Sequence, residues 1–174
     1  MASTPKYDLE QLLKLTQKLF PTRFSSAPEA KSRLSRLIYT PFVGMKLLSV
    51  RGDVKGLTGK TYKVILLFQR VDYSETEDKK HSIKVKVDNK KSVWMVPVRP
   101  GYDVKFRCSC PDAYFTSLYY AWQSKNLYGP KPRKYVRKTT TYPERNPAKL
   151  PILCKHLISV VQRVRKSKYY KGGK

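Results

Sequence analysis

The chain has few acidic residues: 12 Asp and Glu stand against 37 Lys and Arg among 174 residues. The formal net charge is therefore +25 at pH 7. A surface with this excess attracts polyanions such as nucleic acid, an anionic membrane or an acidic protein. The alternative is a basic protein whose charge serves only solubility. The size of the excess favours a polyanionic partner.

Long apolar runs are also lacking. No stretch approaches the roughly 18 apolar residues of a membrane-spanning helix, and the first residues, "MASTPKYDLEQ", lack the basic-then-apolar layout of a secretory signal. Three cysteines are an odd number, which a fully paired disulfide scaffold would not contain. We therefore expect a reducing, cytoplasmic location and no membrane partner.

The residues of common catalytic sites are scarce. There are only two histidines, the acids are scattered, and no glycine-rich phosphate loop, nucleophile elbow or carboxylate pair is present. The sequence thus predicts neither an enzyme nor a small-molecule substrate. A metal site open to water would reverse this prediction.

Apolar residues are nevertheless sufficient for a core, at 40% of the chain. Residues 1–42 have helical spacing and predict two helices, the second running to about Tyr39. Residues 43–101 alternate between apolar and polar, which predicts an antiparallel β-meander. We expect one globular unit of the α+β class, with N-terminal helices before the meander and a cysteine-bearing C-terminal region.

That C-terminal region is predicted to span 102–165, before a basic tail at 166–174. It contains a strand, a long insert at 111–153 and a final helix. Within the insert, Phe115, Leu118 and Trp122 share one face of a predicted helix, and an aromatic stripe of this kind is more often core than ligand platform.

The cysteines and one histidine have the spacing of a metal site. In "FRCSCPD", Cys108 and Cys110 point to one face if the strand continues, because side chains repeat with period two. In "LPILCKH", Cys154 and His156 converge only if the cysteine precedes a helix and the histidine lies in its first turn. Three thiols and an imidazole complete the tetrahedral shell that Zn²⁺ prefers, which predicts a structural zinc ion.

Neighbouring residues could support such an ion. Three thiolates leave a zinc cluster at about −1, which Lys105, Arg107 and Lys155 could offset. Asp112 is a candidate acceptor for the free ring N–H of His156. The alternatives are a strained Cys108–Cys110 disulfide, buried free cysteines, or an exposed redox-sensing thiol.

The sequences "CSCPD" and "CKHLISV" resemble the SWIM-type zinc finger, whose pattern is C-x-C followed downstream by C-x-H. The resemblance covers 102–165 and places the family's ligands on Cys108, Cys110, Cys154 and His156. It departs from the family in its spacer, since 43 residues separate the two pairs. The family is associated with DNA binding and protein–protein interaction. The small basic form with "RNPAKLP" is also similar to proteins of tailed bacteriophages.

The insert and the C-terminus concentrate the charge. From Ala113 to Lys174 there are fifteen Lys and Arg residues and one acid, Glu144. Prolines stiffen the insert and tyrosines interrupt its charges, so it offers phosphate contacts and stacking faces for bases. The residues expected to contact nucleic acid, whether DNA or RNA, are Arg133, Lys134, Tyr135, Arg137, Lys138 and Arg145.

Extended basic arms also serve in large assemblies. The same insert could dock on acidic surfaces of neighbouring proteins, with its tyrosines as anchors. The alternative prediction is therefore a structural, virion-type protein that is incorporated in a particle. Nucleic-acid binding remains the preferred hypothesis because of the charge.

Overall fold

A four-stranded antiparallel sheet forms the centre of the protein. The structure is a computed structural model that describes residues 6–27, 32–89, 91–136, 138–141 and 143–172. The strands lie in the order β1-β2-β3-β7. Their bounds are β1 (Ile38–Phe42), β2 (Leu47–Lys55), β3 (Thr61–Gln69) and β7 (Val104–Cys108). Because apolar residues alternate along β3 and β7, one face of the sheet is buried.

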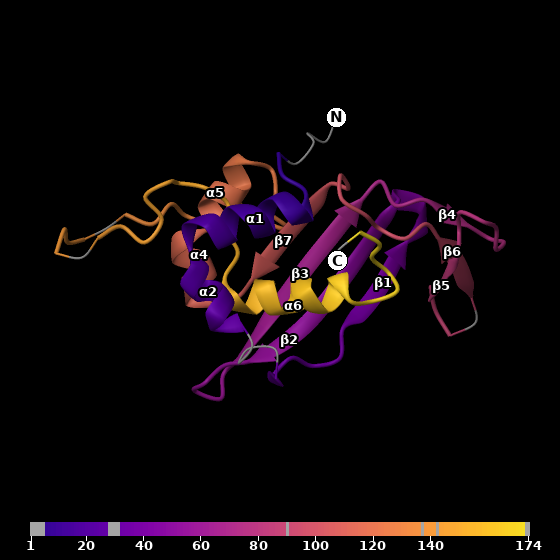
Figure 1. Ribbon diagram of the computed structural model, residues 1–174, viewed down its shortest axis with the longest axis horizontal. Coiled ribbons are helices and arrows are strands. Elements are labelled where there is room, and N and C mark those ends of the chain that lie inside the picture. Colours follow the sequence, from indigo (N-terminus) through magenta and orange to yellow (C-terminus); the bar gives the residue numbers. More distant parts are fainter. Residues whose placement is uncertain (1–5, 28–31, 90, 137, 142, 173–174) are drawn as a thin grey trace.

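Three short strands form a second antiparallel sheet at one end of the first (Figure 1). They lie in the order β4-β6-β5, with bounds β4 (Tyr73–Ser74), β5 (Ile83–Lys86) and β6 (Ser92–Met95). A short 3₁₀ helix, η1 (Val43–Met45), joins β1 to β2. The α+β class is confirmed, and the strands predicted as one meander are divided between two sheets.

Helices from both ends of the chain cover the buried face of the central sheet. α1 (Leu9–Leu19), α2 (Pro21–Ser25) and α6 (Lys155–Arg165) lie over it, and α4 (Pro111–Thr116) and α5 (Leu118–Gln123) lie at the end opposite the small sheet (Figure 1). Asp8 caps α1 through a reciprocal pair of hydrogen bonds with Gln11. None of the described helices has the length and apolar character needed to cross a membrane.

The second predicted helix, of which residues 28–31 lie outside the described part of the chain, does not extend to Tyr39. Residues 38–42 instead form β1, which pairs with β2 at the edge of the sheet. Pro41 is tolerated there because an edge strand has one side without ladder hydrogen bonds. Of the apolar residues whose spacing indicated a helix, Leu34 and Leu37 pack against the core, whereas Ile38 is exposed.

The C-terminal helix belongs to the core. Its inward residues are all at most 1% exposed, namely Leu157, Ile158, Val160, Val161 and Val164. They join one apolar cluster with α1 and the central sheet. Apolar packing therefore contributes to holding α6 on the sheet.

Replacing Ile158 with alanine should lower the free energy of unfolding by about 2–5 kcal/mol, because the change leaves a cavity in the core. Urea denaturation measures the effect. Leu57→Ala is the matched control, since Leu57 is 67% exposed and its truncation should cost less than about 0.5 kcal/mol. Equal effects of the two changes would contradict the placement of α6 in the core.

Candidate metal centre

Three chain segments meet at the cysteines. Cys108 is the last residue of β7, and Cys110 is the N-cap of α4. Cys154 is the N-cap of α6, and His156 lies in the first turn of that helix. The strand end, the loop and the two helix starts thus deliver four ligand side chains to one place, as the sequence predicts.

The four side chains form a closed, buried group. Their ligand atoms all lie within 4.8 Å of one another, and Nδ1 of His156 is 4.0 Å from Sγ of Cys108. All three cysteines are free thiols, so the alternative of a disulfide is not realised. The ring of Tyr62 lies against the imidazole, with 4.8 Å between centroids. This group could hold a metal ion.

The thiols differ in their readiness to ionise. Hydrogen bonds from Cys108 and Cys154 lower the pKa of the Cys110 thiol, and the backbone N–H of Ala113 donates to its Sγ at 3.3 Å. Burial raises the pKa of Cys154, and the hydrogen bond with Cys110 raises that of Cys108. The hydrogen bonds to Cys110 thus favour the thiolate form of this residue. Further thiolates in the same buried space require a cation.

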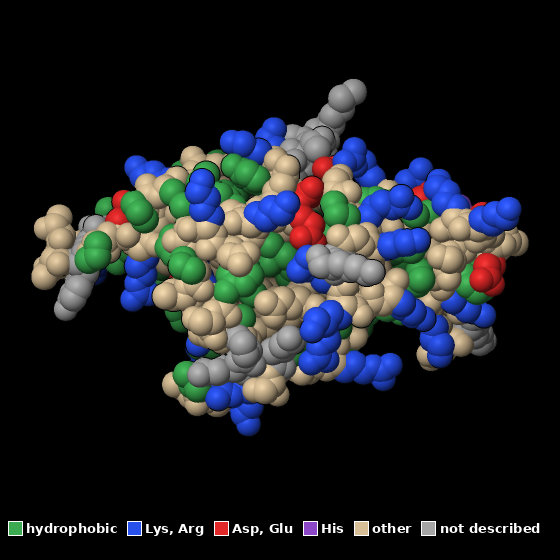
Figure 2. Space-filling model, viewed as in Figure 1, with side chains coloured by type: hydrophobic (Ala, Val, Ile, Leu, Met, Phe, Trp, Pro, Cys, Tyr) green, Lys and Arg blue, Asp and Glu red, His purple; other side chains and the backbone are tan. Residues whose placement is uncertain are grey.

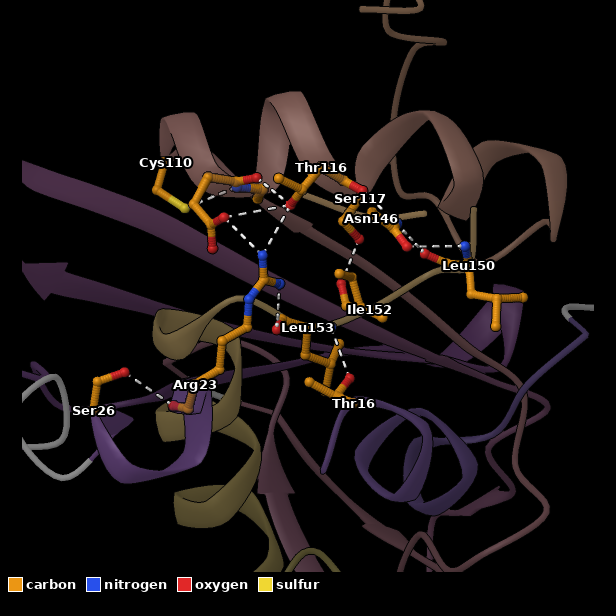
Figure 3. Close-up of polar contacts among 12 residues, drawn as sticks. Thr16, Arg23, Ser26, Cys110, Thr116, Ser117, Asn146, Leu150, Ile152 and Leu153 are labelled. Atoms are coloured by element: carbon orange, nitrogen blue, oxygen red, sulfur yellow. Dashed lines mark hydrogen bonds and ion pairs between the residues drawn. The ribbon is translucent and has the colours of Figure 1, made fainter. Parts of the chain in front are cut away.

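Arg23 of α2 clamps the two halves of the cluster together (Figure 3). Its Nη2 lies 2.7 Å from Oδ1 of Asp112 in α4, and its Nη1 donates to the carbonyl of Leu153 at 3.0 Å. The same Nη2 donates to the hydroxyl of Thr116. Arg23 thus fixes the segment before Cys154 against the helix that begins after Cys110. Nothing in the local sequence "PTRFS" indicates this role.

Buried polar side chains hold the chain as it returns from the insert (Figure 3). The N–H of Leu153 donates to the hydroxyl of Thr16 at 2.9 Å, and the hydroxyl of Ser117 donates to the carbonyl of Ile152. The amide of Asn146 donates to the carbonyls of Thr116 and Leu150. The base of the insert is therefore closed by protein contacts as well as by the cluster.

Asp112 does not serve as the acceptor for His156 among the contacts of the described residues. Its carboxylate faces Arg23 and Thr116 instead. Burial raises the pKa of this carboxyl, against the opposing effect of the Arg23 charge. Asp112 lies in the first turn of α4, whereas His156 lies in the first turn of α6. The relative orientation of these two helices cannot be predicted from the positions of the residues in the sequence.

Arg107 also lies apart from the cluster, because side chains alternate along β7. Its Nε donates to the carbonyl of Tyr128 at 2.7 Å, and its Nη2 donates to that of Pro130. The guanidinium therefore anchors the beginning of the extended insert rather than offsetting thiolate charge. Burial lowers its pKa.

The predicted aromatic core stripe is wrong. Phe115 and Trp122 are 47% and 39% exposed, and only Leu118 of the three predicted residues is buried. Apart from Leu118, the buried residues of these helices are small, namely Ala113, Thr116 and Ala121. A break at Ser117 separates α4 from α5, so one continuous helical period does not describe both.

Aromatic rings and cations meet where the part of the insert that follows α5 passes α4 and α5. Nζ of Lys131 lies 3.9 Å from the centre of the Trp122 ring, and Nζ of Lys134 lies 5.8 Å from that of Tyr119. Tyr135 contacts Phe115 edge to face, with 5.0 Å between centroids. The sequence signal for this surface is the series of aromatic residues along α4 and α5.

A cavity of about 560 Å³ lies between α4 and the insert. Phe115, Tyr135, Lys138 and Arg145 contribute to its lining. Arg133 and Lys134, which directly precede Tyr135 in the sequence, are both exposed. The predicted contact Arg137, and the insert residue Tyr142, lie outside the described residues.

The chain has no significant match to a protein-family model, a curated protein or a solved structure. The resemblance to the SWIM-type finger therefore stays a prediction.

Replacing Arg23 with methionine should destabilise the protein by about 1–3 kcal/mol, because Asp112 and the Leu153 carbonyl lose a charged donor in a largely buried place. Arg70→Met removes a matched arginine–carboxylate pair in which Arg70 is 67% exposed. That change should cost less than about 1 kcal/mol. Urea denaturation compares the two variants, and an Arg23 effect no larger than the Arg70 effect would argue against the clamp.

Proposed function

We propose that the cluster binds one structural Zn²⁺ through Cys108, Cys110, Cys154 and His156. The composition of three thiols and an imidazole supports zinc, which takes sulfur ligands at about 2.3 Å in a tetrahedron. Tetrahedral ligand atoms at such distances stand about 3.8 Å apart, which is compatible with the 4.8 Å spread of the group. All four positions are protein side chains, which supports a structural role over a catalytic one.

Protein purified with zinc present should contain one zinc per chain after dialysis, by elemental analysis. Cys154→Ser and His156→Gln should each lose most of it, because either change removes a ligand. His81→Gln is the matched control, since His81 bonds Asp78 and lies outside the cluster; it should retain the metal. Equal zinc content in the two histidine variants would refute the ligand assignment.

We also propose that the protein binds single-stranded nucleic acid at the face that α4, α5 and the part of the insert after α5 form together, called the insert face below. The observation that carries this proposal is the exposure of Phe115 and Tyr135 beside Lys138 and Arg145 around one cavity. Aromatic rings stack on unpaired bases and cations contact phosphates, which together are the usual composition of a single-strand site.

Lysines that already lie over rings support the same function. The ammonium groups of Lys131 and Lys134 are held beside Trp122 and Tyr119. A phosphate bound by either lysine would bring the adjoining base next to a ring. Zinc and the clamp of Arg23 would contribute by fixing the two ends of the insert, which lowers the ordering cost of binding.

The double change Phe115→Leu with Tyr135→Leu should weaken binding of a single-stranded oligonucleotide at least fivefold, because each lost stack is worth about 1 kcal/mol or more. Fluorescence anisotropy at 50 mM salt measures the affinity. Val136→Ala is the control: Val136 is 75% exposed, carries neither ring nor charge, and adjoins Tyr135. Unchanged affinity in the double variant would contradict stacking at this face.

Docking on an acidic protein surface of a larger assembly is the second candidate. The exposed apolar side chains of Phe115, Trp122, Tyr135 and Val136 favour it, because aromatic residues are frequent anchors of protein interfaces. Under this alternative Val136→Ala would weaken retention in a nuclease-treated complex, and the oligonucleotide affinity of the wild type would be negligible.

A further inference from the structure

A second basic surface lies at the end of the molecule opposite the insert. It is a groove of about 1220 Å³ between β1, β5 and the end of α6. Its cations are Arg36, Lys84, Lys86, Arg163, Lys166 and Lys168. Figure 2 shows Lys and Arg side chains gathered between the end of α6 and the small sheet. We call this surface the basic groove.

The fold brings these cations together from three segments. On β5 the apolar Val85 is buried, so Lys84 and Lys86 point outward by strand alternation. Arg163 and Lys166 come from the end of α6, where the helix dipole alone would favour them. That preference does not account for Arg36 or the two β5 lysines, which arrive from other elements.

Among the described residues, no acid lines the groove. None of its lining residues is Asp or Glu, and none of its six cations forms an ion pair with a residue that the structure describes. The next arginine along α6 behaves differently: Nε of Arg165 donates to Glu10 at 2.8 Å. All six groove cations are exposed. The groove thus holds like charges whose mutual repulsion a polyanion would relieve.

The aromatic residues of the groove face each other. Tyr39 and Tyr169 stack with 4.0 Å between ring centroids, so each occupies a face of the other. The insert face offers exposed rings as well as charge, whereas the basic groove offers mainly charge. Contacts of this kind suit phosphates rather than unpaired bases.

We propose that the basic groove binds the sugar–phosphate backbone of double-stranded nucleic acid. A duplex presents one negative charge per roughly 1.7 Å of its axis, a density that an acidic protein surface does not sustain. The six cations that line the basic groove provide a positive charge density that complements the phosphates of a duplex. The residues differ from those of the insert face, so the groove acts independently of the single-strand site.

The test removes three charges with Lys84→Gln, Lys86→Gln and Lys166→Gln in one protein. Its affinity for a short duplex of random sequence is measured between 50 and 200 mM salt. Each lost phosphate contact reduces the slope of log K against log salt by about 0.9, so the slope should fall by about 2–3. Arg163→Gln with Lys168→Gln removes two cations from another side of the groove, and this double change should lower the slope by about 2.

The matched control is Lys14→Gln, Lys18→Gln and Lys60→Gln, which removes the same charge from exposed lysines outside the groove. It should change the slope by less than about 1. An equal loss in the control would overturn the proposal in favour of diffuse attraction. Tighter groove-dependent binding of polyglutamate than of the duplex would overturn it in favour of an acidic protein partner.

The two nucleic-acid proposals fail separately. Phe115→Leu with Tyr135→Leu should leave the duplex slope unchanged, because neither ring lines the groove. Absence of single-strand binding would therefore refute the proposal for the insert face only. The proposal for the basic groove would still be decided by the salt dependence of duplex binding. Loss of the duplex slope in the ring variant would refute the separation of the two surfaces.

Discussion

The meeting of three thiols and an imidazole in one buried place is the constraint on which the architecture of the C-terminal half depends. Cys108 ends a strand and Cys110 caps the helix that follows it, whereas Cys154 caps another helix and is separated from Cys110 by 43 residues. Burial opposes the ionisation of more than one thiol, so the group is stable as thiolates only with a cation. The proposed zinc ion would supply that charge.

Protein contacts, in addition to the cysteine and histidine cluster, hold the two ends of the insert together. Arg23 joins α4 to the Leu153 carbonyl, Thr16 receives the Leu153 N–H, and α6 is packed into the core. The part of the insert that follows α5 is therefore fixed at its start, where Arg107 bonds the Tyr128 carbonyl, and at its end, where Asn146 bonds the Thr116 carbonyl. Fixed ends limit the conformations of the segment between them, which favours a defined face on α4 and α5.

Local patterns predicted the cluster and most strands, because a two-residue period and a helix start determine where neighbouring side chains point. These patterns failed where contacts between distant segments determine the secondary structure or the burial of a residue. The spacing around Ile38 is helical, yet pairing with β2 makes it a strand. Phe115 and Trp122 have core spacing, yet both are exposed, and the residues that α4 and α5 bury are Ala113, Thr116, Leu118 and Ala121. Arg23 and the basic groove depend on contacts between remote segments, for which one sequence holds no signal.

X-ray absorption at the zinc edge tests the central claim most directly, because it counts the ligand atoms of the bound metal. On the zinc-loaded protein, the account predicts three sulfur atoms at about 2.3 Å and one nitrogen at about 2.0–2.1 Å. Zinc surrounded mainly by oxygen, or zinc far below one per chain in protein prepared with the metal, would contradict it.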